Sequence, residues 1–390
     1  KKCFLGPNNQ LNQQPDINVE IRVPNEFQKV GKYNIGITAG METTLISPEW
    51  IEGCNKMDLI IVPSEHSKKT FIQSKWDKMQ DLPNGQKQKV GELKIEKPIE
   101  VLFEGADTNI YKKTKDIPET IKSTIDNIKE NFCFLYVGHW LKGDIGQDRK
   151  DTGMLVKVFL ETFKNKPNPP ALVMKTSGAT FSIIDRDDIM KKIDIVKKQI
   201  ENAKTLPPIY LLHGDLTDEE MNGLYNHSKV KASVSFTKGE GFGRPLLEST
   251  FADKLVIAPN WSGQTDFLDS KFSVMLPGKL NNVHQSAVWD KVILAESQWF
   301  TIDYGYASKT LTDVWKNHKN YTTRAMKQGT QNRLKFTLDN MKKEFSVLMD
   351  KYIPEFPKQV DLKLPQLKKV GDKKTQPAKM KLPKLKPVGA

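Results

Sequence analysis

The sequence predicts an α/β fold with two doubly wound domains, each built on a parallel sheet, that face each other across a cleft. Three observations favour this fold. The chain has 390 residues, which suits two domains better than one core. Short apolar segments typical of strands alternate with segments typical of helices, as in parallel sheets covered by helices. The alternation pauses over residues 107–118 and then restarts, which indicates one sheet on each side of a linker.

The first series of segments lies within residues 1–118, which we expect to form a short first domain. Ser64 stands directly before its second helix, where the hydroxyl can accept a hydrogen bond from the first helical turn. We expect strands at residues 18–23, 34–38, 59–63 and 99–103, and helices at residues 47–54 and 66–76.

The second series lies within residues 119–305, which we expect to form the second domain. The chain after about residue 286 has mostly helical character, and residues 306–352 are expected to pack back on the domains as helices. Within the second series, the expected strands are residues 132–137, 172–174, 209–212, 232–236 and 255–258, and the expected helices are residues 153–163, 187–202, 218–227 and 246–251.

The C-terminal tail, residues 353–390, differs in composition from the rest of the chain. It carries ten lysines against three acidic residues, which is about half of the formal net charge of +13. Residues 362–371 recur as residues 380–389, and the prolines at 365, 377, 383 and 387 exclude a continuous helix. We expect a disordered basic tail, either simply solvated or a short motif for an acidic partner such as nucleic acid or an anionic membrane.

Composition also excludes several classes of protein. No apolar run approaches the roughly 18 residues that span a bilayer, so no transmembrane segment is expected. The first residue is Lys1, and no signal-like apolar segment follows it, so processing or truncation at this end is one reading. Cys3, Cys54 and Cys133 form no C-x-x-C pair, which argues against a disulfide framework or a zinc site and favours a cytoplasmic protein.

The segment KGEGFGRPLLE, residues 238–248, carries the chemistry of the predicted site. It follows an apolar strand, and Pro245 suits the first turn of a helix. Ligands of doubly wound sheets bind at such strand-to-helix loops, where the helix offers unpaired N–H groups and glycines allow close approach. Glu240 would repel a bare phosphate, so we expect it to accept from sugar hydroxyls, and Glu248 from a ribose. The alternative is that Glu240 is a solvated loop residue and Glu248 a surface residue of the helix.

Glu240 and Glu248 form the pattern E-x7-E, and the strand 255–257 and the turn 262–266 follow it. This resembles the retaining GT-B glycosyltransferases of the family 4 type. The likeness covers about residues 34–268 and is looser in the first domain, where the family's opening strand and glycine-rich loop have no counterpart. Asp266 and Glu104 stand where the family usually has Glu and His. Other similar segments, in chain order, are METT (41–44), VPSE (62–65), EGAD (104–107), FLYVG (134–138), RK (149–150), LVMK (172–175) and HGDL (213–216).

The resemblance implies transfer of a hexose, with retention of anomeric configuration, from a nucleotide-diphosphate sugar to an acceptor hydroxyl. The donor, UDP- or GDP-linked, would be a co-substrate, with no metal and no other cofactor. Glu240 would orient the donor sugar, Arg149 and Lys150 would neutralise its diphosphate, and Glu42 would face the acceptor. The further donor-binding residues that the resemblance implies are Gly138, Lys175, His213, Gly241, Phe242, Gly243 and Glu248.

The sequence leaves open the roles of two further side chains near the predicted site and two alternative functions. Lys238 is either a further phosphate ligand or a surface lysine, and His139 is a candidate for the cleft wall. The acceptor could be a saccharide, a protein or a nucleic acid, and glycosylation of DNA bases would suit the basic tail. A non-catalytic carbohydrate-binding or scaffold protein with the same fold is the alternative outside the enzymes.

Overall fold

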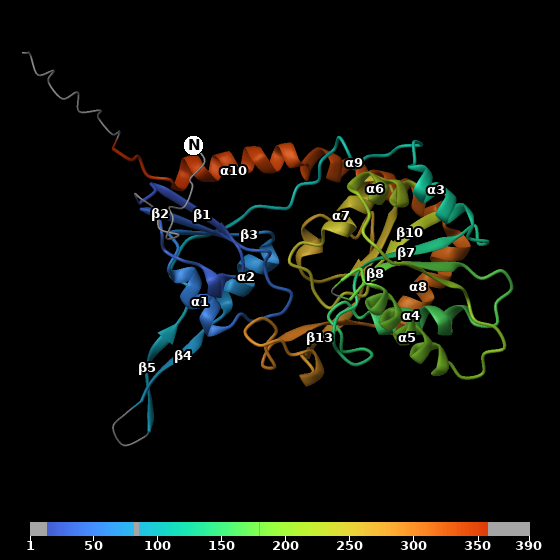
Figure 1. The fold of residues 1–390 in the computed structure, drawn as a ribbon, viewed down its shortest axis with the longest axis horizontal. Helices are drawn as coiled ribbons and strands as arrows, with labels where there is room; N and C mark the ends of the chain where they lie inside the picture. The colour runs from blue at the N-terminus through green and yellow to red at the C-terminus, as the bar shows by residue number, and fades with distance from the viewer. Residues whose placement is uncertain (1–13, 82–85, 179, 358–390) are drawn as a thin grey trace, which may run out of the picture. The chain divides into compact units, whose positions relative to one another are not determined.

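The computed structural model describes residues 14–81, 86–178 and 180–357, so most of the predicted tail, residues 358–390, lies outside the described residues. The described residues up to Pro354 belong to one compact unit, which contains two separate parallel sheets. Figure 1 shows these sheets, one formed early in the chain and one in its middle. Among the helices of the described residues, none is both long enough and apolar enough to span a lipid bilayer.

The first sheet has four parallel strands in the order β1–β2–β3–β6. All four predicted strands are present, and Ser64 caps the second helix as expected, accepting from the backbone N–H of Ser67 at 3.2 Å. The short 3-10 turn η1 (Pro24–Glu26) follows the first strand. The elements are β1 (Ile17–Ile21), β2 (Tyr33–Ile37), α1 (Pro48–Asn55), β3 (Leu59–Val62), α2 (Glu65–Gln73) and β6 (Ile99–Val101).

A charged hairpin, which the sequence pattern did not predict, interrupts this series. The helix predicted over residues 66–76 ends at Gln73, and the chain continues into β4 (Trp76–Asp81), which pairs antiparallel with β5 (Lys87–Leu93). The described residues of β5 are exposed almost throughout, so the hairpin lacks the alternation of apolar and polar residues that marks a half-buried strand. In Figure 1 the hairpin extends away from the first sheet.

The second sheet has six parallel strands in the order β12–β11–β10–β7–β8–β9. The chain winds outward from β7 in one direction through β9, then returns to the other side of β7 with β10. Ligands of such sheets bind where the winding direction reverses, here at the carboxyl ends of β7 and β10. The strands are β7 (Cys133–His139), β8 (Ala171–Ser177), β9 (Ile209–Leu212), β10 (Val230–Val234), β11 (Leu255–Pro259) and β12 (Val274–Leu276).

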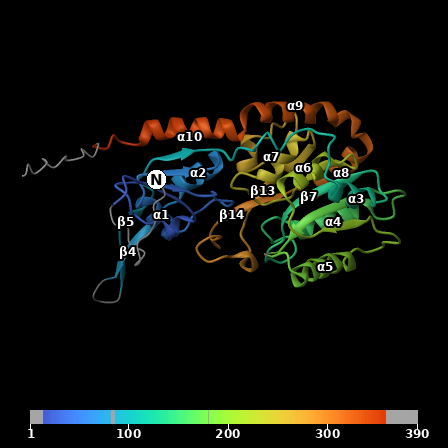
Figure 2. The same ribbon diagram turned by 45° about the horizontal axis from the view of Figure 1, so that its top comes forward.

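Helices cover both faces of the second sheet, which confirms the doubly wound arrangement predicted for it. Phe159 of α4 and Ile193 of α5 pack in one buried cluster with Phe134 and Leu172, whereas Tyr225 and Leu247 belong to the cluster on the opposite face. Figure 2 shows α4 and α5 on one side of the sheet and α6 and α7 on the other. The helices are α3 (Glu119–Asp126), α4 (Thr152–Phe163), α5 (Ile183–Lys198), α6 (Asp218–Asn226) and α7 (Arg244–Phe251).

The C-terminal part of the described chain combines a hairpin with three helices. The expected helical structure after residue 286 is present as α8, α9 and α10, and β14, which pairs antiparallel with β13, was not predicted. Helix α10 returns to the first sheet, where Phe345 and Leu348 pack with Ile35 and Ile61 (Figure 1). These elements are η2 (Gly263–Asp266), β13 (Gly278–Asn282), η3 (Gln285–Ala287), β14 (Gln298–Ile302), α8 (Tyr304–Asn317), α9 (Lys319–Lys335) and α10 (Leu338–Tyr352).

Candidate active site

A cavity of about 620 Å³, called the cleft below, lies at the carboxyl ends of β7, β8 and β10, where the second sheet changes winding direction. Segments that follow strands of the first sheet supply Ala39, Glu42 and Glu104 to its lining. Six of the predicted site residues line it together: Glu42, Gly138, Arg149, Lys150, Lys175 and Glu240. The cleft therefore unites candidate donor-binding and acceptor-side residues in one space.

The glycine-rich loop is shaped by its contact with the first sheet's loop at residues 39–42. A Cβ at Gly239 would lie 1.9 Å from the carbonyl oxygen of Glu42, and one at Gly241 would lie 2.0 Å from that of Ala39. Both distances are far below van der Waals contact, so no larger residue fits without movement. The interpretation that these two glycines make room for a ligand is therefore corrected, because the space is filled by another part of the chain.

Two hydrogen bonds reinforce this contact from the start of α2. Ser64 donates its hydroxyl to the carbonyl oxygen of Gly241 at 2.5 Å. The carboxylate of Asp266 accepts from the backbone N–H of Glu65 at 2.9 Å. Asp266, which stands where the resembled family usually has Glu, thus binds an unpaired N–H group at the N-terminus of a first-sheet helix. This role was not visible in the sequence.

Two of the three cations that line the cleft are paired with its carboxylates. Arg149 forms an ion pair with Glu42, and Lys150 forms one with Glu240, with 12% of each side chain exposed in the second pair. The residues of each pair come from different loops, so the pairs depend on tertiary approach and not on sequence spacing. Glu240 is thus neither a solvated loop residue nor an isolated charge.

Burial shifts the protonation equilibria of two groups in the cleft. Desolvation lowers the pKa of Lys150 to about 8, with the charge of Glu240 opposing the shift. Desolvation raises the pKa of Glu104, and the charge of nearby Arg244 opposes that shift. Glu104 was given no role because it replaces a family histidine, yet it lines the cleft. Its place in the EGAD segment was the signal that could have identified it.

Lys175 and His213 occupy different positions relative to the cleft. Lys175 lines the cleft, donates to the carbonyl oxygen of Gly214 at 2.7 Å and lies 5.2 Å from the ring centre of Phe181. His213 does not line it and bonds through Nε2 to Asp185 at 2.8 Å. Phe181, which sequence reasoning missed, forms part of the cleft wall between them.

Four other predicted donor-binding residues lie behind the cleft surface. Glu248 is 6% exposed and bonds to Arg244 at 3.0 Å and to the hydroxyl of Tyr225 at 3.3 Å. Desolvation raises the pKa of Glu248 to about 7. The ring of Phe242 is buried against Phe267, with ring centres 5.0 Å apart. None of Gly241, Phe242, Gly243 and Glu248 lines the cleft.

Gly138 and His139 form a wall of the cleft beside their β8 partners, Thr176 and Ser177. Gly138 and His139 both line the cleft at the end of β7, as the FLYVG segment suggested for Gly138. A Cβ at Gly138 would lie 2.9 Å from the hydroxyl oxygen of Tyr136, so the small residue keeps this wall open. Nδ1 of His139 lies 3.1 Å from the hydroxyl oxygen of Ser177, which holds the imidazole against β8.

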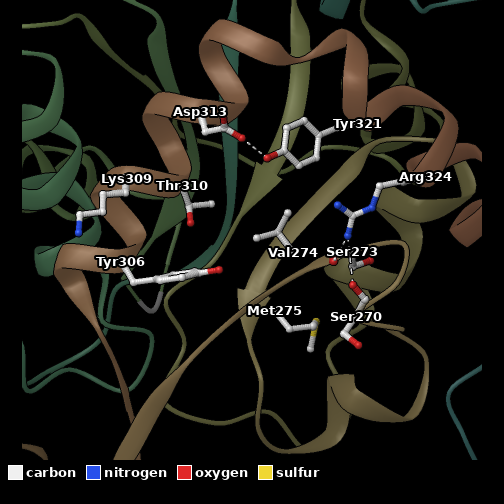
Figure 3. A pocket seen from close by; sticks show the side chains of 10 residues that line it. All are labelled: Ser270, Ser273, Val274, Met275, Tyr306, Lys309, Thr310, Asp313, Tyr321 and Arg324. Atoms are coloured by element: carbon white, nitrogen blue, oxygen red, sulfur yellow. Dashed lines mark hydrogen bonds between the residues drawn. The ribbon is translucent and has the colours of Figure 1, made fainter.

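A second hollow, of about 360 Å³, lies beside the edge strand β12 and is lined by α8 and α9 (Figure 3). Some of its polar side chains bind one another or the backbone. Tyr321 donates to Asp313, and Arg324 donates to the carbonyl oxygens of Lys271 at 2.9 Å and Ser270 at 3.1 Å. None of the predicted site residues lines this hollow, so the cleft remains the candidate active site.

Comparisons with known proteins identify the fold. No protein-family profile matches the chain, and no curated protein matches it in sequence. Anabaena Alr3699/HepE in complex with UDP-glucose aligns with a TM-score of 0.54 and 13% identity, over 82% of this chain and 72% of that chain. Sucrose-phosphate synthase from Thermosynechococcus elongatus gives a TM-score of 0.55 and 11% identity, over 82% and 67% of the two chains.

A third structure, described as trehalose-6-phosphate from E. coli bound with UDP-2-fluoro glucose, gives a TM-score of 0.54 and 10% identity, over 88% of this chain and 74% of that chain. At such identities the likeness concerns the fold. The chain therefore has the GT-B fold that the sequence predicted, with two parallel sheets contributing to one cleft.

Proposed function

We propose that this protein is a retaining glycosyltransferase that moves a hexose from a nucleotide-diphosphate sugar to an acceptor hydroxyl. One observation carries the proposal. Arg149, Lys150 and Lys175 meet beside Glu240 in a single cleft, at the place where a doubly wound sheet binds ligands. Three cations next to a carboxylate match a ligand that has a diphosphate at one end and hydroxyl groups at the other.

The diphosphate is the part of the donor that the cations would hold. The guanidinium of Arg149 offers paired planar donors to phosphate oxygens, and the lysines act as point charges. The complexes of Alr3699/HepE with UDP-glucose and of the E. coli protein with UDP-2-fluoro glucose support a UDP-linked donor over a GDP-linked one. Phe181 and Lys175 would flank the nucleotide where the cleft wall is aromatic.

Glu240 would orient the hexose by accepting from its hydroxyl groups, as the resemblance to family 4 implies. Glu42 and Glu104 lie on the first-sheet side of the cleft, which is the side from which the acceptor would approach. Glu248 and His213 lie behind the surface and would support the ribose and base only after a local movement. The acceptor is a saccharide in this proposal.

In the proposed reaction the bond between the hexose C1 and the diphosphate oxygen breaks, and the acceptor oxygen forms a bond to C1 on the same face. The acceptor proton passes to a phosphate oxygen of the departing diphosphate. Arg149, Lys150 and Lys175 stabilise the negative charge that grows on that group. The resemblance to family 4 implies that no metal takes part in this stabilisation.

The first test is a calorimetric titration with UDP-, GDP- and ADP-sugars. We expect a UDP-sugar to bind with a dissociation constant below about 1 mM, the upper range of enzyme substrates. Arg149→Ala should weaken binding about 10- to 100-fold, because it removes a charge-assisted contact to phosphate. Arg186→Ala is the matched control, since the ion pair that Arg186 makes among the described residues is with its neighbour Asp187, at an exposed site.

The second test follows turnover and its products. Glu240→Gln should retain donor binding but lose transfer, and NMR of the product should show the anomeric configuration of the donor. Activity should persist in a metal chelator. Absence of binding by all three sugars removes the proposed function, inverted product removes the retaining mechanism, and binding without turnover favours a carbohydrate-binding protein.

A further inference from the structure

A buried ion pair lies directly behind the cleft. The Nζ atom of Lys238 is 3.4 Å from a carboxylate oxygen of Asp151, and the two side chains are 1% and 0% exposed. Neither residue lines the cleft. Lys238 is thus neither a phosphate ligand nor a surface lysine, the two readings that the sequence allowed. Asp151 directly follows Arg149 and Lys150, and Lys238 stands two residues before Glu240.

The pair belongs to a hydrogen-bonded network that joins three segments. Tyr304, at the start of α8, donates to the carboxylate of Asp151 at 2.6 Å. Lys238 donates from Nζ to the hydroxyl of Thr301 in β14 at 3.1 Å, and its backbone N–H donates to the carbonyl oxygen of Arg149 at 2.9 Å. The loop with the two cleft cations is therefore attached to the loop with Glu240 by side chain and backbone alike.

Stability alone does not account for this arrangement. Transferring two charges out of water costs several kcal/mol per ion, so apolar residues at such a site often give an equally stable protein. Asp151 also adopts a left-handed backbone conformation, with φ of 52°. Its Oδ1 atom is buried without a hydrogen-bond partner within the described residues. Such unfavourable features concentrate where a precise geometry is needed nearby.

We propose that Lys238 and Asp151 are positioning residues, which hold the loop of Arg149 and Lys150 against the glycine-rich loop so that both cations face the donor diphosphate beside Glu240. The proposal rests on the function proposed above. The pair acts through its neighbours and touches no substrate. Burial raises the pKa of Asp151 to about 6 and the charge of Lys238 opposes the shift, so the carboxylate is ionised at neutral pH.

The test is a double-mutant cycle in the full chain with Lys238→Met, Asp151→Asn and the double variant. Each single variant leaves one buried polar group without its partner and should lower the free energy of unfolding and kcat together. The double variant should regain stability, because no unpaired charge remains and the new side-chain amide can still accept from Tyr304 through its oxygen. Its kcat should stay about 10- to 100-fold below wild type, as expected for displaced groups, and its donor KM should rise, because the displaced cations bind the diphosphate less tightly.

Asp253→Asn is the matched control. Asp253 also has a left-handed backbone, with φ of 57°, and it pairs with Arg333 at 2.8 Å away from the cleft lining. This variant should lower stability while kcat stays within about twofold of wild type, because it disturbs no loop of the cleft.

Hydrogen exchange without donor gives a readout that does not depend on catalysis. The double variant should exchange faster than wild type in the amides of residues 147–152 and 238–243, and the control variant should not. Recovery of kcat together with stability in the double variant overturns the proposal, as does unchanged exchange in both loops. A wild-type protein that binds no nucleotide sugar instead overturns the proposed function, and exchange still decides whether the pair holds the loops.

Discussion

At the scale of single residues, the main property of the cleft is that two of its three cations already have anionic partners. Arg149 is bound to Glu42 and Lys150 to Glu240, so a donor diphosphate has to compete with carboxylates for the same N–H groups. The two carboxylates differ in what they would gain from the donor. Glu240 can exchange its lysine for sugar hydroxyls, whereas Glu42 offers nothing to the donor and only competes with it.

Glu42→Gln should therefore tighten donor binding while Arg149→Ala weakens it. A partly exposed ion pair contributes up to about 1 kcal/mol, so the expected gain for Glu42→Gln is up to about fivefold in the dissociation constant. Calorimetry with UDP-glucose measures both variants. Weaker binding by Glu42→Gln would show that Glu42 contacts the donor and does not merely compete for Arg149.

Donor binding should also depend on pH through Lys150. The pKa of this lysine is lowered to about 8, mainly by desolvation, so the side chain is charged below this pH and neutral above it. The affinity for UDP should fall as the pH rises through about 8, by about tenfold per pH unit once the lysine is mostly neutral. Lys150→Arg keeps its charge throughout this range, so its binding should not decline there. An equal decline in Lys150→Arg would assign the titration to another group.

The sequence named several residues of the cleft but not the contacts between them, because contacts between distant loops leave no local sequence pattern. Arg149, Lys150 and Lys175 were named through the family resemblance, and all three line the cleft. The partners Glu42 and Glu240 could not be matched with their cations, because those contacts join loops that are distant in sequence. Lys238 was misjudged because nothing in the sequence shows that a lysine beside glycines points into the protein.

At the scale of elements, the continuously apolar strands were predicted, whereas the strands of the two hairpins and β12 were not. The strands β3 and β11 are completely buried, and such continuous apolar runs stand out in a sequence. The hairpin strand β5 is exposed, and β12 has only three residues. Whether such a segment forms a strand depends on the strand it pairs with and not on its own composition. A local sequence pattern therefore does not predict it.

The glycine-rich loop provides a prediction at this scale. Gly241→Ala should destabilise the protein by about 1–3 kcal/mol, because the added methyl group would overlap the carbonyl oxygen of Ala39. Chemical denaturation measures the effect. Gly91→Ala is the control, since a Cβ at Gly91 meets nothing within 4 Å, and it should be nearly neutral. Equal free energies of unfolding for the two variants would mean that the two loops can move apart at little energetic cost.

At the scale of the described unit as a whole, the contacts between the first sheet's loops and the second sheet's loops define the cleft. Asp266 binds the N-terminus of α2, and Ser64 of the same helix start binds Gly241. The backbone around the cleft is thereby held from both sides before any donor arrives. Donor affinity should depend on these contacts even though Asp266 and Ser64 do not line the cleft.

Asp266→Ala should lower the free energy of unfolding by about 1 kcal/mol, the usual effect of losing a cap, and should also weaken UDP binding. Thr337→Ala removes the cap of α10, where Thr337 accepts from Asn340 at 3.1 Å, and provides a comparison of similar stability cost. It should leave UDP binding unchanged. Thermal unfolding and calorimetry on the same samples separate the two effects, and unchanged UDP affinity in Asp266→Ala would contradict the expectation.

The close approach of Gly239 and Gly241 to the carbonyl oxygens of Glu42 and Ala39 has a consequence for how related sequences diverge. Because there is no room for one added methyl group between the two loops, the residues present in one loop limit the substitutions allowed in the other. Substitutions at positions 39–42 should appear in homologues together with compensating changes at positions 239–241, and insertions should be rare in either loop. An EGFG pattern in a distant relative would then reflect the close packing of these two loops in that relative, whichever sugar it uses.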